Sequence, residues 1–187
     1  MSAPAHRPPE RLEAGPVVLQ RGRPEHAEAV AAAVAASLDH LRPWMFWATP
    51  ESSTVEQQRT RLSDAAEQWE KGTAFDFVVL SATSGEVVGN CGLMRRGGPG
   101  EIEIGYWVHV DHTGRGYGRA LAGALTDAGS ALADVDRVEI HCDRANLASA
   151  AIPRALGYRL DREAPGRFPQ APAETGRDQI WVMSASQ

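Results

Sequence analysis

The sequence has few cysteines, no long apolar run and no excess of basic residues. Its two cysteines, Cys91 and Cys142, lie far apart without a C-x-x-C spacing, which argues against a disulfide framework or a zinc site and indicates buried thiols. No apolar stretch approaches the roughly 20 residues of a membrane span, and the N-terminus lacks an apolar signal core. The formal net charge of -5 argues against a nucleic-acid surface. We therefore expect a cytoplasmic protein that binds no nucleic acid, membrane or metal.

Length and composition predict one domain behind a short tail. With 187 residues, 43% of them hydrophobic, the chain is long enough to bury a sizeable core. Its opening, MSAPAHRPPERLEAGP, is rich in proline, alanine and charge and has no periodicity. This pattern predicts a flexible tail over residues 1–15, a single domain over residues 16–187, and ordered structure from Val17 onward.

Apolar periodicity indicates a mixed α/β sheet. The expected strands are 17–21, 75–81, 86–94, 101–110, 137–143 and 178–184, and the expected helices are about 25–42, 53–71, 117–133 and 147–156. The short connections ATSG and RRGGPG predict antiparallel hairpins in the middle of the chain, followed by alternating strands and helices. Residues 163–178, rich in proline and glycine, are expected to form an exposed loop.

The second expected helix has its own start and stop signals. The S-x-x-E spacing of Ser53 and Glu56 predicts a capping box, and Gly72 predicts the end of the helix. Its expected buried stripe consists of Val55, Leu62, Ala66 and Trp69.

The segment HTGRGYGRA places Gly114, Gly116 and Gly118 between a predicted strand and a predicted helix. Glycines permit positive φ and a close ligand, and the helix that follows offers free N–H groups, so the loop predicts a cradle for phosphate or pyrophosphate. The spacing matches neither G-x-x-x-x-G-K-[ST] nor G-x-G-x-x-G, which disfavours ATPase and NAD-binding functions. A simple turn from strand to helix is the alternative.

The strand before this loop carries an acid that needs explaining. Period-2 alternation places Glu103 on one face with Trp107, opposite Ile102 and Ile104. Glu103 is therefore either a residue on a solvated outer face or a general base in a partly desolvated cleft.

Two segments resemble a known family. EIGYWVHVDHTGRGYGRA, followed by RVEIHCDRANLASAAIPRALGY, resembles the coenzyme-binding half of a GNAT-superfamily acyltransferase, and IGYW and CDRANLAS are similar to its RimJ/RimL-type branch. The resemblance implies a GNAT fold, in which a mostly antiparallel mixed sheet has splayed central strands and flanking helices. It also implies an N-acetyltransferase that uses acetyl-CoA as the acyl donor and no metal.

The same resemblance assigns coenzyme contacts. The family motif [QR]-x-x-G-x-[GA] maps onto residues 113–118, with Thr113 where Gln or Arg is usual. Arg115 and Arg119 are plausible partners of coenzyme phosphates or simply solvated. Asn146 matches an Asn near the pantetheine arm and is also a good helix N-cap. The implied coenzyme-binding residues are Val108, His109, Val110, Thr113, Gly114, Arg115, Gly116, Tyr117, Gly118, Arg119 and Asn146.

The resemblance also implies a mechanism of direct transfer. Glu103 is the candidate base, directly or through a water, with Asp76 as a weaker candidate. The N–H of Val108 would stabilise the oxyanion. The family's Tyr acid is replaced by Pro153, which is expected to shorten or bend its helix, so Ser149 is the candidate acid for the leaving thiolate. Three nearby histidines are expected to be structural: His109, His112 and His141.

The acceptor amine stays open at this point. The resemblance allows a peptide N-terminus or a small-molecule amine, and the expected walls are Trp44, Trp47 and Trp107, together with Phe46, unless these aromatic residues are core. An acyl-CoA-binding module with little turnover and a nucleotide-binding regulatory domain are the alternative functions. A homodimer is possible.

Overall fold

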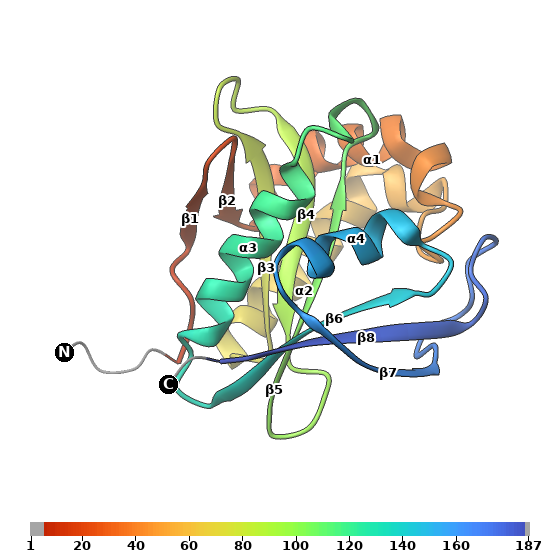
Figure 1. Cartoon of the computed structure of the whole chain (residues 1–187). Helices are drawn as coiled ribbons and strands as arrows, with labels where there is room; N and C mark the ends of the chain where they lie inside the picture. Colours follow the sequence, from red (N-terminus) through yellow and green to blue (C-terminus); the bar gives the residue numbers. More distant parts are fainter. Residues whose placement is uncertain (1–5, 186–187) are drawn as a thin grey trace.

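Eight strands form one continuous sheet in the computed structural model, which describes residues 6–185 (Figure 1). In chain order the strands are β1 (Arg11–Ala14), β2 (Val17–Arg21), β3 (Ala74–Ser81), β4 (Val87–Met94), β5 (Gly100–Val108), β6 (Val135–Asp143), β7 (Arg159–Pro165) and β8 (Arg177–Ser184). The helices are α1 (Ala27–Leu41), α2 (Val55–Lys71), α3 (Tyr117–Ser130) and α4 (Leu147–Ala155). Every helix and strand expected from the sequence is present.

The sheet is mostly antiparallel and opens in its middle. Its strand order is β1-β2-β3-β4-β5-β6-β8-β7, and only β5 and β6 run parallel. Their pairing ends at Ile104 and Ile140, although β5 continues to Val108 and β6 to Asp143. The expected mixed sheet with splayed central strands is thus confirmed.

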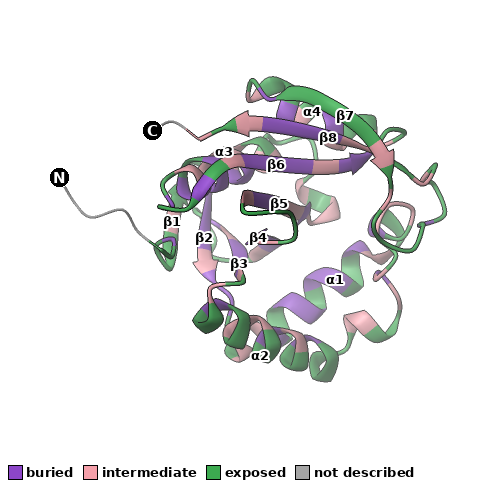
Figure 2. Ribbon diagram, turned by 90° about the horizontal axis from the view of Figure 1, so that it is seen from below, coloured by how far each residue is buried: buried purple, intermediate pink, exposed green. Residues whose placement is uncertain are grey.

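Helices cover both faces of this sheet. α1 and α2 pack together on one face, and α3 lies with α4 on the other (Figure 1). Leu121 and Leu125 of α3 are fully buried against Ile102 and Ile104 of β5, because these residues recur at the periods of a helix and a strand. The inner sides of the strands and helices are accordingly buried, whereas β7 and the outer side of α2 are exposed (Figure 2).

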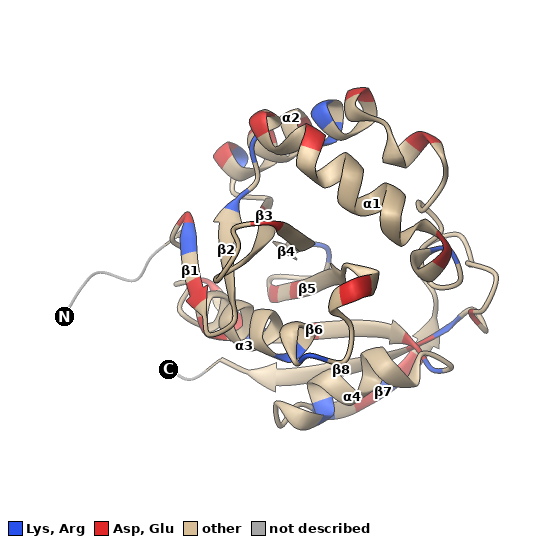
Figure 3. Ribbon diagram, turned by 90° about the horizontal axis from the view of Figure 1, so that it is seen from above, with Lys and Arg blue, Asp and Glu red and all other residues tan. Residues whose placement is uncertain are grey.

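The outer surface of α2 mixes charges of both signs. Basic and acidic residues both occur along this helix (Figure 3), and Glu67 pairs with Lys71 one turn later. In the part of the chain that the structure describes, no helix is both long and apolar enough to cross a membrane.

The predicted tail was wrong for its last residues. Arg11–Ala14 form β1, which pairs antiparallel with β2 across a turn at Gly15, where φ is +61°. Glu10 adds ion pairs to Arg21 at 2.7 Å and Arg23 at 2.8 Å. Only Leu12 and Ala14 of this four-residue strand face the core, which is too short a pattern to predict a strand from sequence. Residues 1–5 of the predicted tail lie outside the described residues.

Two further expectations needed correction. Thr54, not Ser53, caps α2, because the Thr54 side chain accepts from the Gln57 N–H, while Val55 at the first position is exposed. The predicted loop at 163–178 begins inside β7, an exposed edge strand that pairs with β8. Gly72 does end α2, in the left-handed conformation with φ of +69°.

The burial pattern of α2 predicts that shortening a buried side chain lowers the stability of the protein more than shortening an exposed one. We expect Leu62→Ala to lower the free energy of unfolding by about 2–5 kcal/mol, because Leu62 is fully buried. Val55→Ala on the same helix should change it by less than about 0.5 kcal/mol. Urea unfolding followed by circular dichroism measures both values, and similar losses for the two variants would contradict the burial pattern.

Candidate active site

A cavity of about 550 Å³ lies on the α1/α2 face of the sheet, next to the point where β5 and β6 part. Side chains from β3, β4, β5 and β6 form its floor. The α1–α2 connection and the β7–β8 connection form its mouth. Many of the residues predicted from the sequence meet here: Asp76, Glu103, Trp107, Asn146, Ser149, Trp44 and Trp47.

Glu103 is buried in this cavity, which excludes a solvated outer face. Its side chain extends from β5 on the cavity side, as period-2 alternation predicts, and the residue is 8% exposed. Arg96 donates to Oε1 at 3.2 Å and Arg167 donates to Oε2 at 2.8 Å. Both oxygens of the carboxylate are therefore held by guanidinium groups.

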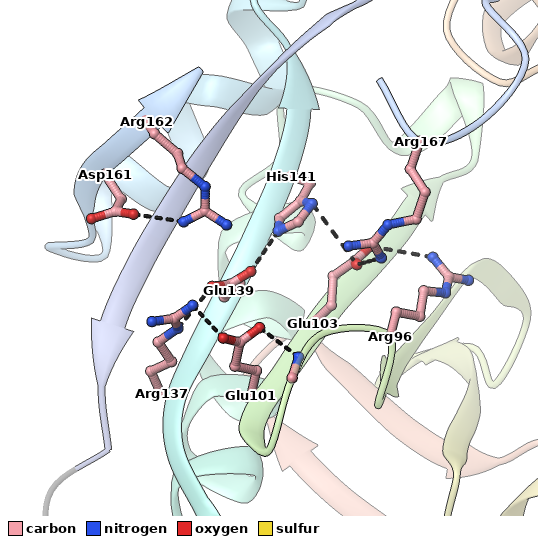
Figure 4. A network of polar contacts seen from close by, with 10 residues as sticks. Arg96, Glu101, Glu103, Arg137, Glu139, His141, Asp161, Arg162 and Arg167 are labelled. Atoms are coloured by element: carbon pink, nitrogen blue, oxygen red, sulfur yellow. Dashed lines mark hydrogen bonds and ion pairs between the residues drawn. The ribbon is translucent and has the colours of Figure 1, made fainter. Parts of the chain in front are cut away.

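His141 lies between two carboxylates on the same face of the sheet (Figure 4). Its Nε2 is 2.7 Å from Glu139 Oε2, and its Nδ1 is 3.9 Å from Glu103 Oε2. Because a carboxylate only accepts, Nε2 carries a proton in the contact with Glu139, whereas Nδ1 is too far from Glu103 for a hydrogen bond. The hydrogen bond from His141 lowers the pKa of Glu139, although burial acts to raise it. The sequence predicts a structural role for His141, and the alternate positions of Glu139 and His141 in one strand already place both side chains on the same face of the sheet.

The mouth contains residues for which the sequence held no signal. Arg167 and Phe168 come from the predicted exposed loop, and Phe168 stacks on Phe46 at a centroid distance of 5.5 Å. Arg96 lies over the Phe168 ring at 5.0 Å. Trp107 packs near Trp47 at 6.4 Å and belongs largely to the hydrophobic core beneath.

Asp76 occupies a structural position at the edge of the cavity. Its Oδ2 accepts from Arg61 at 2.9 Å and its Oδ1 from Asn90 at 3.2 Å. A Cβ added to Gly22 would approach Oδ1 to 2.3 Å, so the carboxylate also fills space beside the backbone.

Where β5 and β6 separate, the backbone N–H of Val108 faces the gap. The N–H of His109 donates to Val88 O at 2.8 Å, on the β4 side. Successive N–H groups of a strand point to opposite sides, so the N–H of Val108 is directed away from β4 toward the opening. The N–H of Val110 is occupied by Ser37 Oγ at 3.1 Å. Val108, His109 and Val110 were all predicted to contact the coenzyme, and of these three residues Val108 alone directs its N–H toward the opening.

The glycine loop leads into a helix without a side-chain cap. Gly114 and Gly116 have φ of +73° and +80°, and a Cβ at either would meet nothing within 4 Å. Gly118 differs, because it lies inside α3 and a Cβ there would come within 2.8 Å of Ile152 Cδ1. No side chain caps α3, so the first N–H groups of this helix are left without a side-chain acceptor.

The other loop residues either fix the turn or lie free beside it. Thr113 Oγ1 donates to Val110 O at 3.0 Å, and His112 stacks on Tyr117 at 5.5 Å. Arg115 and Arg119 are exposed, and neither forms an ion pair with any described residue. Two cationic side chains thus remain available at the N-terminus of α3.

Helix α4 carries the remaining predicted residues. Asn146 caps it, since its Oδ1 accepts from the Ser149 N–H at 3.0 Å. α4 is short, as expected from Pro153, but the proline lies inside it and leaves the Ser149 carbonyl without its helical donor. Tyr106 Oη lies 3.5 Å from both that carbonyl oxygen and Ser149 Oγ. Cys142 lines the same cavity, and burial raises the pKa of its thiol to about 11.

A parallel strand pair that parts beside a glycine loop, with the loop leading into a helix N-terminus, defines the GNAT acyltransferase fold. The chain belongs to the GNAT acetyltransferase family: residues 17–159 match the family profile described as "Acetyltransferase (GNAT) domain". A sequence search of curated proteins gave no significant match.

Solved structures of the same fold include several acetyltransferases. The RimL ribosomal L7/L12 alpha-N-protein acetyltransferase in complex with coenzyme A is similar at a TM-score of 0.83 and 18% identity, over 94% of this chain and 98% of that chain. The ribosomal-protein-S5-alanine acetyltransferase from Vibrio fischeri is similar at 0.82 and 19%, over 95% and 97%. The microcin C7 self-immunity acetyltransferase MccE, in complex with acetyl-CoA and AMP, is similar at 0.80 and 13%, over 91% and 93%.

The buried network predicts a pH-dependent contribution to stability. We expect Glu139→Gln to lower the free energy of unfolding by about 1–3 kcal/mol at neutral pH, because His141 and Arg137 lose a charged acceptor. Since the folded-state pKa of Glu139 lies below its ordinary value of 4.5, this contribution is complete above 4.5 and is lost as pH falls through the folded value.

Urea unfolding at neutral and acidic pH tests this expectation. The difference between wild type and Glu139→Gln should shrink in acid. Glu67→Gln, which alters an exposed pair on α2, should change stability by less than about 0.5 kcal/mol at either pH. A difference that stays constant into acid would show that the charge of Glu139 does not stabilise the fold.

Proposed function

We propose that this protein transfers the acetyl group of acetyl-CoA directly to a primary amine, either a peptide N-terminus or a small-molecule amine. The observation that carries the proposal is the opening between β5 and β6, which presents the Val108 N–H on one side of a cavity that contains Glu103 and His141. Membership of the acetyltransferase family and the coenzyme complexes of structurally similar proteins support the same conclusion.

The coenzyme would be held at the backbone and at the start of α3. Gly114 and Gly116 leave open space where phosphate oxygens can approach the first N–H groups of the helix, and Arg115 and Arg119 add charge-assisted donors. The Val108 N–H then faces the thioester carbonyl, where a positioned donor stabilises the negative charge that develops on oxygen.

The acceptor ammonium must lose a proton before it can attack. Glu103, the base predicted from the sequence, has both oxygens held by arginines, so we assign the acceptance of the proton to His141 Nδ1. Glu139 fixes the tautomer of His141 from the opposite side, and the Glu103 carboxylate at 3.9 Å stabilises the imidazolium that forms. Glu103 thus acts through His141.

Ser149 would serve the leaving thiolate in place of the family's tyrosine, whose position Pro153 occupies. Its hydroxyl lies in the cavity near the end of the opening. The loss of that tyrosine also favours the second candidate function, an acyl-CoA-binding module with little turnover, which predicts coenzyme binding without acetylation of any amine.

The glycine cradle can be tested by comparing two left-handed glycines. Gly116→Ala and Gly72→Ala impose a similar backbone strain, about 1–2 kcal/mol each, because both have positive φ and open space around the Cβ. We expect Gly116→Ala, but not Gly72→Ala, to weaken acetyl-CoA binding by about tenfold, because the backbone N–H groups of the glycine loop would shift.

Calorimetric titration with acetyl-CoA measures this effect, with ATP and NAD as control ligands. Wild-type binding of acetyl-CoA but not of ATP or NAD supports the proposed function. Equal affinities of the two glycine variants would remove the cradle from the coenzyme site.

The proposed base predicts a loss of turnover without a loss of coenzyme affinity. We expect His141→Gln to lower kcat by about 100-fold and Glu103→Gln to lower it by about tenfold, while the Kd for acetyl-CoA changes by less than about twofold. The acceptor would be the fastest amine from a panel of short peptides and small primary amines.

The pH dependence separates this role from a structural one. A general base cannot act once it holds a proton, so wild-type kcat should fall in acid, and His141→Gln should flatten that limb. His40→Gln, at the exposed end of α1, should behave as wild type. An unchanged acid limb in His141→Gln would contradict the assignment.

A further inference from the structure

Tyr106 lies where β5 has lost its parallel partner. It follows the last paired residue, Ile104, by two positions and precedes Val108 by two, so its side chain leaves the strand on the same face as that of Val108. From there its phenol reaches α4, where Oη lies 3.5 Å from Ser149 Oγ. The phenol of Tyr106 on the sheet thus lies next to Ser149, the residue that would face the sulfur of the leaving CoA.

Pro153 explains why a second acceptor is present at the same place. Proline has no N–H, so the carbonyl oxygen of Ser149, four residues earlier, receives no helical hydrogen bond from it. Tyr106 Oη lies 3.5 Å from this oxygen as well. Rotation of the phenol O–H therefore moves one proton between two acceptors of the same residue.

Burial keeps Tyr106 a hydrogen-bond donor. Removal from solvent raises the pKa of its phenol, which stays protonated throughout the pH range in which an amine acetyltransferase works. A phenol of this kind serves as a fixed donor rather than as an acid that gives up its proton.

We propose that Tyr106 is a positioning residue that donates to Ser149 Oγ and thereby directs the Ser149 proton to the sulfur of CoA. A serine hydroxyl has one proton; when its oxygen accepts from Tyr106, that proton is free for another acceptor. As the C–S bond breaks, its electron pair stays on sulfur, and the thiolate accepts the Ser149 hydrogen bond. This inference rests on the proposed acetyl-CoA function.

Coenzyme binding tests the proposal without a known acceptor. A site that stabilises the thiolate lowers the pKa of bound CoA, so CoA should bind more tightly as pH rises through the ordinary range of a thiol, whereas desulfo-CoA should not. Calorimetry with CoA and desulfo-CoA at about pH 6 and about pH 9 isolates the contribution of the sulfur. For the wild type we expect the affinity for CoA, relative to that for desulfo-CoA, to increase about tenfold between the lower and the higher pH. This increase is called the gain below.

Four variants test the proposed role of Tyr106. Tyr106→Phe and Ser149→Ala should each reduce the gain to about twofold or less while keeping desulfo-CoA affinity. Tyr158→Phe is the matched control, since Tyr158 is also buried but contacts Thr126 at 2.6 Å, away from the cavity, and it should keep the wild-type gain. Pro153→Ala gives the Ser149 carbonyl a helical hydrogen-bond donor, so the Tyr106 O–H is left with Ser149 Oγ as its acceptor. The gain in affinity for CoA relative to desulfo-CoA should then be at least that of the wild type.

Contrary results are distinguishable. A full gain in Tyr106→Phe, a full gain in Ser149→Ala, or a lost gain in Pro153→Ala would overturn the role of Tyr106 and leave the proposed function standing. Failure of the wild type to bind either CoA or desulfo-CoA would overturn the proposed function and, with it, this inference.

Discussion

The separation of β5 from β6 is the constraint on which the rest of the molecule depends. Pairing stops at Ile104 and Ile140, so the following backbone groups at the centre of the sheet have no partner strand. Unpaired backbone donors in a sheet are costly unless water or a ligand satisfies them. The opening persists because β4 holds the outer side of β5 and β8 holds the outer side of β6, each by antiparallel pairing along the strand. Helices α3 and α4 then cover the region next to the opening.

The second constraint is charge beneath the cavity. Glu103 and Glu139 are almost completely buried, and isolated carboxylates in such places would be strongly unfavourable. Arg96 and Arg167 neutralise Glu103, while Arg137 and His141 bond to Glu139 (Figure 4). The polar floor is therefore a connected network in which His141 has one ring nitrogen, Nδ1, outside hydrogen-bond distance of Glu103. Under the proposed function, the proton of the acceptor would therefore pass to the imidazole rather than to the carboxylate of Glu103, whose two oxygens are already held by arginines.

Much of the fold and part of the site could be predicted from sequence, for identifiable physical reasons. The buried strands and helices carry strong periods of 2 and 3.6, and the same alternation placed Glu103 on the cavity side. Strand β1 was missed because it has only two apolar residues, Leu12 and Ala14, on its buried face, which is too few for a recognisable period, and β7 was missed because it is exposed along most of its length. Arg167 could not be linked to Glu103, since 64 residues separate them and only the folded β7–β8 connection brings them together. Val55 was misplaced because its position on the first turn of α2 lies beyond the edge of the packed face.

The stacked rings of Phe46 and Phe168 have a consequence for how such a protein diversifies. The two rings belong to connections that contribute nothing to the pairing of β5 with β6 or to the glycine loop. Changes of length or composition in these connections alter what can enter the cavity while the opposite side of the opening stays intact. Under the proposed function, the connections that would admit the acceptor are thus separate from the backbone that would hold the acyl donor, and each could change in evolution without disrupting the other.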